Sequence, residues 1–193
     1  MIVLASASAV RARLLHDAGV PFEVRPSALN EAEEKALFAG ERPEDIAWRL
    51  AEAKALAAPA GPGDLVIGAD QTLELDGELI NKAADLGEAR ARLKSLRGRE
   101  HRLHSAAALV RDGQVVWMGV RSPKLVMRSF SDAFLESYLS EQAEAALSSV
   151  GCYVLESAGA QLFERIDGDY FAILGLPLIE LLAALRAEGA LAA

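Results

Sequence analysis

Short apolar runs alternate along the chain with longer segments whose apolar positions recur every three or four residues. The short runs contain β-branched residues and are bounded by turn residues, which is typical of strands: residues 2–5, 22–25 and 65–69. The longer segments have the spacing of one helical face: residues 8–18 and 43–57. Interleaved helices and strands predict an α/β protein.

Three Asp-Gly pairs predict tight turns in the rest of the chain: Asp76-Gly77, Asp112-Gly113 and Asp167-Gly168. Strands are predicted on both sides of each pair and after the second hairpin: residues 72–75, 78–81, 103–111, 114–121, 124–130, 162–166 and 170–174. Helices are predicted to begin at Asp85, Ser131 and Pro177 and to end near residues 98, 144 and 188. Because several connections are hairpins, we expect a mixed β-sheet flanked by helices.

The segment with the strongest loop composition, residues 58–63, joins a predicted helix to a predicted strand and does not resemble a domain boundary. The sequence contains no internal repeat. We therefore expect residues 1–193 to form one domain, long enough to bury a core in two lobes.

Composition narrows the class of partner. A hydrophobic fraction of 52% argues against disorder. The net charge of −8 argues against a nucleic-acid binder, which needs a basic face to neutralise phosphates. A small phosphorylated substrate in a local basic pocket remains compatible with this charge.

Cys152 is the single cysteine of the sequence, which excludes an internal disulfide framework and a cysteine-based zinc site. No apolar run reaches membrane-spanning length, and the first residues lack the pattern of a signal peptide. We therefore expect a cytoplasmic protein with no membrane association.

The first candidate site lies where the strand at residues 2–5 is followed by a helix. Ser6 and Ser8 precede the helix, and Arg11 and Arg13 lie in its first turns. In one interpretation a serine caps a surface helix and the arginines are solvated. In the other, hydroxyl, guanidinium and helix N-terminal N–H groups bind phosphate. This stretch alone leaves both interpretations open.

The second candidate site follows the apolar run at residues 65–69. Asp70 lies at the carboxyl end of that run, where open α/β sheets place ligands, although a turn or capping role is an equal alternative. In the hairpin around residues 76–77, a two-residue loop places Gln71 opposite Lys82, and one bulged residue places Asp70 there. Both registers bring an ammonium group close to a carboxylate and an amide.

Lys54 and Glu31 extend this set. Lys54 is a lone cation near the end of an alanine-rich helix, where it either complements the helix dipole or contacts a ligand. Glu31 lies in an acidic run that is either a solvated face or a source of metal ligands. Serine, arginine and lysine for phosphates, with carboxylates for Mg²⁺, form a set of residues suited to phosphate esters.

Several other chemistries lack their motifs. The patterns G-x-x-x-x-G-K-[ST], H-E-x-x-H and G-x-S-x-G are absent from the sequence. His16, His101 and His104 lack the spacing of metal ligands, and we expect them to be packing or surface residues.

An ordered series of motifs covers residues 2 to about 188: LASAS…R…LL at 4–15, Glu31, Lys54, GADQT at 68–72, Lys82, LRGREH at 96–101 and GLPL at 175–178. This series resembles the Maf family of nucleoside triphosphate pyrophosphatases. The resemblance implies an α/β fold with a cleft between two lobes. It also implies cleavage of a nucleoside triphosphate between its α and β phosphates, giving a monophosphate and pyrophosphate.

The resemblance also implies roles for single residues. Asp70 matches the general base of the family, and Glu31 matches an acidic position on the metal side. We therefore expect these two carboxylates to bind a divalent cation, Mg²⁺ or Mn²⁺. Four residues match phosphate-binding positions: Ser8, Arg11, Lys54 and Lys82. The family is further linked to removal of modified nucleotides and to arrest of septum formation, and a homodimer is compatible with it.

The chain departs from the family pattern at three positions. Val10 stands where the family has a phosphate-facing arginine, Asn30 replaces an aspartate, and Ala83 replaces a proline. Arg13 cannot replace that arginine on the same face, because it lies about 200° around the helix from Arg11. These departures leave a second hypothesis open, a nucleotide-binding regulator with weakened catalysis.

The residue types at positions 71 and 156, glutamine and glutamate, resemble those of the branch of the family that prefers 7-methyl-GTP. Together with Val10, Gln71 and Glu156 are the expected specificity positions. A carboxylate accepts from guanine N1–H and the exocyclic amine and favours the positive charge of an N7-methylated base. An ordinary surface acid is the alternative for Glu156. In a regular strand Gln71 points away from the face of Asp70, so this hypothesis requires a bulge or a strand end at Asp70.

Overall fold

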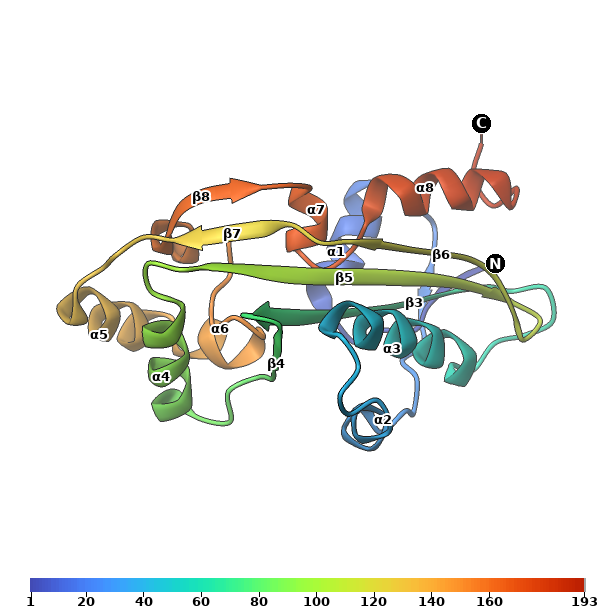
Figure 1. Ribbon diagram of the computed structural model, residues 1–193. Coiled ribbons are helices and arrows are strands. Elements are labelled where there is room, and N and C mark those ends of the chain that lie inside the picture. The colour runs from blue at the N-terminus through green and yellow to red at the C-terminus, as the bar shows by residue number, and fades with distance from the viewer. Residues whose placement is uncertain (193) are drawn as a thin grey trace.

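Two long antiparallel strands, β3 (Leu65–Leu75) and β5 (Glu100–Arg111), form the centre of a mixed sheet (Figure 1). The computed structural model describes residues 1–192 of the chain. The eight strands have the order β2-β1-β3-β5-β7-β8, with β4 paired to β3 and β6 paired to β5. Strand β1 is parallel to β2 and β3, and the other pairs are antiparallel. The predicted mixed α/β fold is confirmed.

The other strands are shorter: β1 (Ile2–Leu4), β2 (Glu23–Val24), β4 (Glu78–Ile80), β6 (Gln114–Arg121), β7 (Lys124–Met127) and β8 (Phe163–Asp167). The helices are α1 (Ala9–Asp17), α2 (Glu31–Leu37), α3 (Pro43–Ala57), α4 (Leu86–Leu96), α5 (Asp132–Glu141), α6 (Ala143–Ser148), α7 (Tyr170–Ile173) and α8 (Leu178–Ala187), with a 3₁₀ helix at Ala158–Leu162. Figure 1 shows α3 on one side of the central strands and α1 and α8 on the other.

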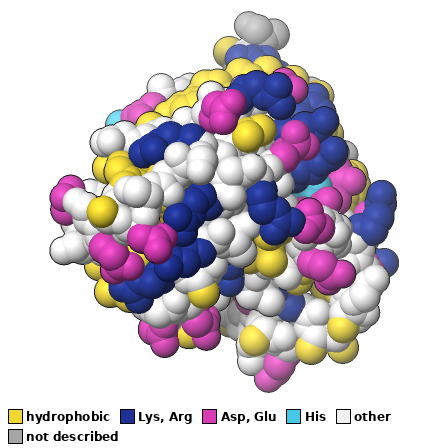
Figure 2. Space-filling model, turned by 60° about the vertical axis from the view of Figure 1, so that its left-hand side comes forward, with side chains coloured by type: hydrophobic (Ala, Val, Ile, Leu, Met, Phe, Trp, Pro, Cys, Tyr) yellow, Lys and Arg dark blue, Asp and Glu magenta, His cyan; other side chains and the backbone are white. Residues whose placement is uncertain are grey.

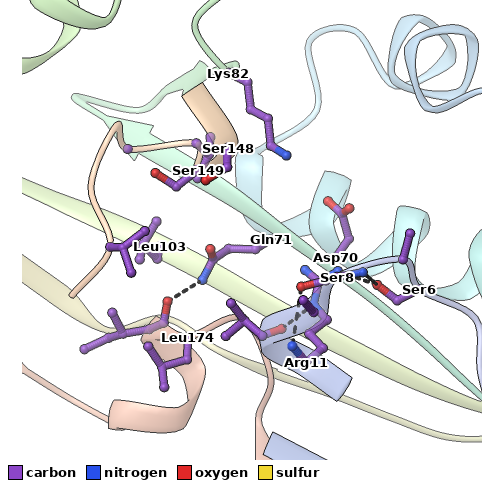
Figure 3. Close-up of a pocket in the computed structure, with 18 of the residues that line it drawn as sticks. Ser6, Ser8, Arg11, Asp70, Gln71, Lys82, Leu103, Ser148, Ser149 and Leu174 are labelled. Carbon is purple, nitrogen blue, oxygen red and sulfur yellow. Dashed lines mark hydrogen bonds between the residues drawn. The ribbon is translucent and has the colours of Figure 1, made fainter. Parts of the chain in front are cut away.

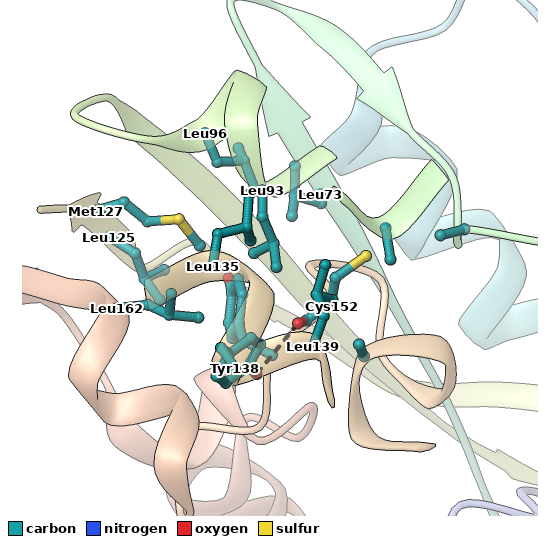
Figure 4. Packing of buried hydrophobic residues seen from close by; sticks show 14 of the residues in the cluster. Leu73, Leu93, Leu96, Leu125, Met127, Leu135, Tyr138, Leu139, Cys152 and Leu162 are labelled. Carbon is teal, nitrogen blue, oxygen red and sulfur yellow. Dashed lines mark hydrogen bonds between the residues drawn. The ribbon is translucent and has the colours of Figure 1, made fainter. Parts of the chain in front are cut away.

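Three apolar clusters divide the sheet into two ends. At one end α1 and α8 pack with Ile67 and Ala69 on one face of β3, and α3 packs on the opposite face. At the other end a separate cluster around Leu73 includes residues of α4 and α5 (Figure 4). Asp70 and Gln71 lie on β3 between these cores. The polar stretch of the strand therefore coincides with the junction of two lobes.

Gly68 allows α3 to approach β3 closely. A Cβ atom at Gly68 would lie 2.1 Å from the carbonyl oxygen of Ala51 and 2.6 Å from the amide nitrogen of Ala55. A side chain at this position would therefore separate the helix from the strand. The close approach brings Lys54, on the same turn of α3, to the neighbouring strand residue Asp70.

The structure corrects two predicted strands near the site. Residues 65–69 and 72–75 belong to one continuous strand, because Asp70 and Gln71 keep their pairing with β5. Residues 170–174 are helical over Tyr170–Ile173 because Asp169 caps this turn, its Oδ1 accepting from the Phe171 N–H at 2.9 Å. A short apolar run is compatible with either class of element, so the pattern alone could not distinguish them.

Other elements also differ from the prediction. The strand predicted at 124–130 ends at Met127, and the helix predicted at 131–144 is divided into α5 and α6 at Gln142. Helix α2 was not expected, since its acidic run has no apolar face and none of its residues is buried. Asn30 caps α2 by accepting from the Ala32 N–H at 3.2 Å. By contrast, α3 and β6 have the predicted boundaries.

Basic and acidic side chains are interspersed on the face that carries α4 and α5 (Figure 2). Arg90 pairs with Glu136 at 2.7 Å, and Arg97 and Lys94 both pair with Asp132. These pairs are exposed, so each contributes little to stability. Within residues 1–192, no helix combines the length and apolar character needed to cross a bilayer.

Candidate active site

A gap in the pairing of β3 lies at the floor of a cleft. One edge of β3 pairs with β5 throughout residues 65–74. The opposite edge pairs with β1 at residues 65–67 and with β4 at residues 73–75. Between them, residues 68–72 have no strand partner on that edge within the described chain. A cleft of about 580 Å³ lies at this gap.

The cleft brings together all nine candidate residues named from the sequence: Ser8, Val10, Arg11, Glu31, Lys54, Asp70, Gln71, Lys82 and Glu156. Figure 3 shows Arg11 and Lys82 on opposite sides of Asp70 and Gln71. The residues come from six separate parts of the chain, so the fold is what makes them neighbours.

Ser8 caps α1, as one of the two interpretations predicted, and it also lies in the cleft. Its Oγ accepts from the Arg11 N–H at 3.4 Å, which makes it the N-cap of α1, and it also lines the cleft. Ser6, one of the serines before the helix, is buried, and its Oγ accepts from the Ser8 N–H at 3.2 Å. The loop before α1 is therefore held by its own serines, with the helix N-terminus facing the cleft.

Arg11 is fixed by three hydrogen bonds from two of its nitrogens. Nε donates to the Gly175 carbonyl at 2.9 Å, and Nη1 donates to Ser6 Oγ at 3.2 Å and to the Ala69 carbonyl at 3.1 Å. The Ala69 carbonyl belongs to the unpaired edge of β3. Nη2 has no hydrogen-bond partner within residues 1–192, so its two N–H groups remain for a ligand. Burial lowers the pKa of the guanidinium, against the opposing charges of Asp70 and Glu31.

Lys54 joins the two candidate metal carboxylates. Its buried Nζ lies 2.6 Å from Oδ1 of Asp70 and 2.8 Å from Oε1 of Glu31. Oδ2 of Asp70 is buried and has no hydrogen-bond partner in the described chain. Burial by itself would raise the pKa of Glu31, but the hydrogen bond and charge of Lys54 lower it below its ordinary value, with smaller contributions from Lys35 and Lys82.

The residues present fit a divalent cation that the substrate helps to coordinate. Within residues 1–192, no group of three acidic, histidine or cysteine side chains forms a complete metal site. Mg²⁺ usually binds one or two protein carboxylates and takes its remaining ligands from water and phosphates. Asp70 Oδ2, which is buried and unpartnered, and the half-exposed Glu31 provide such a pair.

Lys82 lies beyond the end of its predicted strand. The two-residue turn register is correct, since Leu75 pairs with Glu78 and Leu73 with Ile80. The ladder ends at Ile80, however, so Lys82 is not a ladder partner of Gln71 or Asp70. It is exposed at the cleft, where its charge contributes to the lowered pKa of Glu31.

The bulge expected at Asp70 is absent, and Gln71 lines the cleft without it. The register with β5 is continuous from Leu65 to Glu74, so the side chains of Asp70 and Gln71 lie on opposite faces of β3. Asp70 contacts Lys54 on α3, whereas Gln71 bonds to carbonyl groups of α7. Both reach the cleft because it opens at the edge of the strand rather than on one face.

Glu156 lines the cleft as part of an ion pair. Its Oε1 lies 2.8 Å from Nη2 of Arg13, with 21% of the Glu156 side chain and 52% of the Arg13 side chain exposed. Arg13 therefore connects α1 to the loop that carries Glu156. It does not take the place of the family arginine at Val10, because Val10 lines the cleft and Arg13 does not.

Two of the three histidines are buried, and one of them, His101, contacts a cleft residue. His101 Nε2 lies 2.8 Å from Tyr153 Oη, and Tyr153 lines the cleft. Burial lowers the pKa of His101 to about 4, so it is neutral at physiological pH. His104 bonds to Ser122 and Glu74 on the other face. Both are packing residues, as expected, whereas His16 is exposed.

Sequence reasoning missed two residues that contact the site. Ser105 pairs with Gln71 across the sheet, and Gly175 supplies the carbonyl that accepts from Arg11. Gly175 has a φ of +102°, a backbone conformation that favours glycine. The glycine of the GLPL motif was therefore the signal available in the sequence. Ser105 gave no signal, because its role depends on which residue of β3 lies opposite.

Comparison with known proteins is consistent with this geometry. The model of a family described as Maf-like protein matches residues 1–188. A nucleoside triphosphate pyrophosphatase of Caulobacter vibrioides is 54% identical over 192 residues, covering 98% of this chain and 96% of that protein. A 7-methyl-GTP pyrophosphatase of Rhizobium meliloti is 48% identical over 194 residues, covering 99% and 98%.

A solved structure of a nucleoside-triphosphatase (dITP/XTP pyrophosphatase) of Mycobacterium abscessus was also compared with this chain. The alignment covers 98% of this chain and 94% of the chain in that structure. Its TM-score of 0.44 and identity of 17% are too low to support an inference. The family model and the two curated relatives each cover nearly the whole chain. The chain therefore belongs to the Maf family.

Proposed function

We propose that this chain is a nucleoside triphosphate pyrophosphatase. It adds water across the anhydride between the α and β phosphates, which yields a nucleoside monophosphate and pyrophosphate. The observation that carries the proposal is the buried carboxylate of Asp70 in the cleft: Oδ1 is held by Lys54, and Oδ2 is without a partner. The names of the curated relatives support the same activity.

The donors around the cleft suit a triphosphate. Arg11 offers the two N–H groups of Nη2, and α1 offers its N-terminal N–H groups beside Ser8. Lys54 has three N–H donors, two of which bond to Asp70 and Glu31, so one remains for a phosphate oxygen. Lys82 adds an exposed ammonium on the other side.

Asp70 has the role of general base. Oδ2 accepts a proton from the attacking water, while Lys54 keeps the carboxylate in place through Oδ1. The unpaired edge of β3 leaves room for that water and for the phosphate chain. The developing negative charge on the phosphates lies among the ammonium and guanidinium groups.

Asp70 and Glu31 would hold a divalent cation, Mg²⁺ or Mn²⁺, together with phosphate oxygens. When bound, such a cation neutralises phosphate charge and polarises the anhydride. Each carboxylate oxygen has two lone pairs, so the unpartnered Oδ2 can contact the cation and still accept from the attacking water, and the accessible carboxylate of Glu31 supports the same assignment.

Gln71 and Glu156 are proposed to contact the base, which favours guanine-type or N7-methylated substrates. Two relatives carry different names, a general nucleoside triphosphate pyrophosphatase and a 7-methyl-GTP pyrophosphatase. The Glu156 carboxylate already has a cation partner in Arg13, so a cationic base would compete with Arg13 for it.

A catalytically weakened regulator is the second candidate, favoured by the loss of a phosphate-facing arginine at Val10. Asn30 supports it less, because its side chain caps α2. Pyrophosphate release from a panel of nucleoside triphosphates, with and without Mg²⁺, distinguishes the two. We expect Mg²⁺-dependent turnover of at least one substrate. Nucleotide-dependent thermal stabilisation with no pyrophosphate release would favour the regulator.

A further inference from the structure

Three acceptors surround the side-chain nitrogen of Gln71. Nε2 lies 2.8 Å from Ser105 Oγ and 3.0 Å from each of the Ala172 and Ile173 carbonyl oxygens. Carbonyl groups only accept, so the end of the amide that faces α7 must be the nitrogen. The amide orientation is therefore dictated by its partners.

Ser105 reinforces this orientation through its own proton. Its buried hydroxyl donates to the Ala172 carbonyl at 2.5 Å, so the Ser105 oxygen is left as an acceptor toward Gln71. A buried hydroxyl with a single good acceptor has little freedom to rotate. Both N–H groups of Gln71 are then used within the protein.

The oxygen of the same amide has no hydrogen-bond partner in the described chain and points to the cleft. Figure 3 shows the Gln71 oxygen directed away from α7, on the side where Ser148 and Ser149 line the cleft. The hydroxyl groups of these two serines both donate to the Ala145 carbonyl at 3.1 Å. This end of the cleft therefore presents acceptor oxygens.

We infer that Ser105 is a positioning residue, which together with the two α7 carbonyl groups fixes the Gln71 amide so that its oxygen accepts a hydrogen bond from the exocyclic amine of a guanine-type base. The inference rests on the proposed function, because it assigns a role in base recognition. Ser105 has no contact with the substrate and acts through Gln71.

The first experiment compares kcat/KM for GTP and ITP, which differ only in the exocyclic amine donor. Wild type is expected to prefer GTP by roughly fivefold to tenfold. Ser105→Ala should reduce this preference at least about threefold, mainly through KM for GTP.

Thr72→Val is the matched control. It removes a buried hydroxyl from the neighbouring strand β3, where Thr72 donates to the Pro43 carbonyl at 2.7 Å on the opposite face of the sheet.

The control should lose stability without losing the GTP preference. A wild-type ratio near one would overturn the acceptor role of Gln71. An unchanged ratio in Ser105→Ala, or an equal reduction in Thr72→Val, would overturn the positioning role of Ser105.

A second experiment tests the orientation without turnover. Gln71→Glu puts a carboxyl oxygen against the two α7 carbonyls, where only a protonated carboxyl can donate. Its folded-state pKa should be raised, so the Tm deficit relative to wild type should grow from about pH 5 to about pH 8. A deficit independent of pH would contradict the fixed orientation. If no nucleotide is hydrolysed, the proposed function fails while this result still decides the orientation.

Discussion

The ammonium of Lys54 lies 2.6 Å from Oδ1 of Asp70, and both side chains are almost fully buried. The same ammonium contacts Glu31 on the surface helix α2. One cation thus connects the central strand, helix α3 and the outer helix. The pairing leaves the second oxygen of Asp70 without a partner in the described chain, and we propose that Lys54 has both a structural and a functional role.

Lys54→Met is expected to cost about 3–5 kcal/mol of unfolding free energy, because it leaves Asp70 buried without a cation. Pyrophosphate release should also fall by about a hundredfold or more. Chemical denaturation and steady-state turnover check the two effects. Lys94→Met is the matched control, since Lys94 pairs with Asp132 at an exposed site. That control should change stability by less than about 1 kcal/mol. Equal losses of unfolding free energy in the two variants would contradict the stabilising role of the buried pair.

Arg11→Lys keeps the positive charge but loses the fixed geometry of the guanidinium. A lysine cannot serve the carbonyls of Ala69 and Gly175 and still offer two N–H groups to a phosphate. We expect kcat/KM to fall by about tenfold to a thousandfold, measured by pyrophosphate release. Arg13→Lys, on the same helix outside the cleft lining, should retain activity within about threefold. Wild-type kinetics for Arg11→Lys would show that a positive charge at this position is sufficient for activity, and would contradict the role of the guanidinium geometry.

The lowered pKa of Glu31 predicts a pH dependence of stability. A carboxylate with a folded-state pKa below its ordinary value of 4.5 stabilises the fold above that pH. The contribution is lost as the pH falls through the lowered value. The Tm difference between wild type and Glu31→Gln should therefore be present at neutral pH and vanish in acid. Thermal melts over this pH range measure the Tm difference. A Tm difference that grows in acid would contradict the stabilising ion pair between Glu31 and Lys54.

The ion pair between Arg13 and Glu156 predicts a competition for the base. Arg13→Met frees the Glu156 carboxylate, so the preference for 7-methyl-GTP over UTP should increase by roughly twofold to tenfold. Glu156→Gln should lower the same preference. In the double variant, Arg13→Met should have lost its effect, which a double-mutant cycle of kcat/KM values measures. Additive effects would mean that the pair plays no part in specificity.

Much of the fold could be predicted because its signals are local. The turn at Asp76-Gly77 and the cap at Ser8 each depend on a few neighbouring residues, and both are as expected. Residues 170–174, of which Tyr170–Ile173 are helical, were predicted as a strand, since a short apolar run fits both periods. Its helical state depends on the cap supplied by Asp169, a signal that was present but not used.

The nine candidate residues line one cleft, but the contacts among them were not predicted from the sequence. The hairpin register placed Lys82 near Asp70, whereas the cation that contacts Asp70 is Lys54, which the close approach at Gly68 brings to the strand. The pairing of Glu156 with Arg13 joins residues 143 positions apart, and no local pattern contains it. The bulge assigned to Asp70 was unnecessary because the cleft opens at the edge of β3, a feature of sheet topology.

The most direct measurement identifies the products that wild type and Asp70→Asn form from a nucleoside triphosphate in the presence of Mg²⁺. Asp70→Asn keeps the shape of the side chain and leaves an oxygen for Lys54, but it removes the base. Wild type should yield monophosphate and pyrophosphate in equal amounts, and the variant should be slower by at least about a hundredfold while remaining folded. Diphosphate and orthophosphate as products, or full activity in a folded Asp70→Asn variant, would contradict the account.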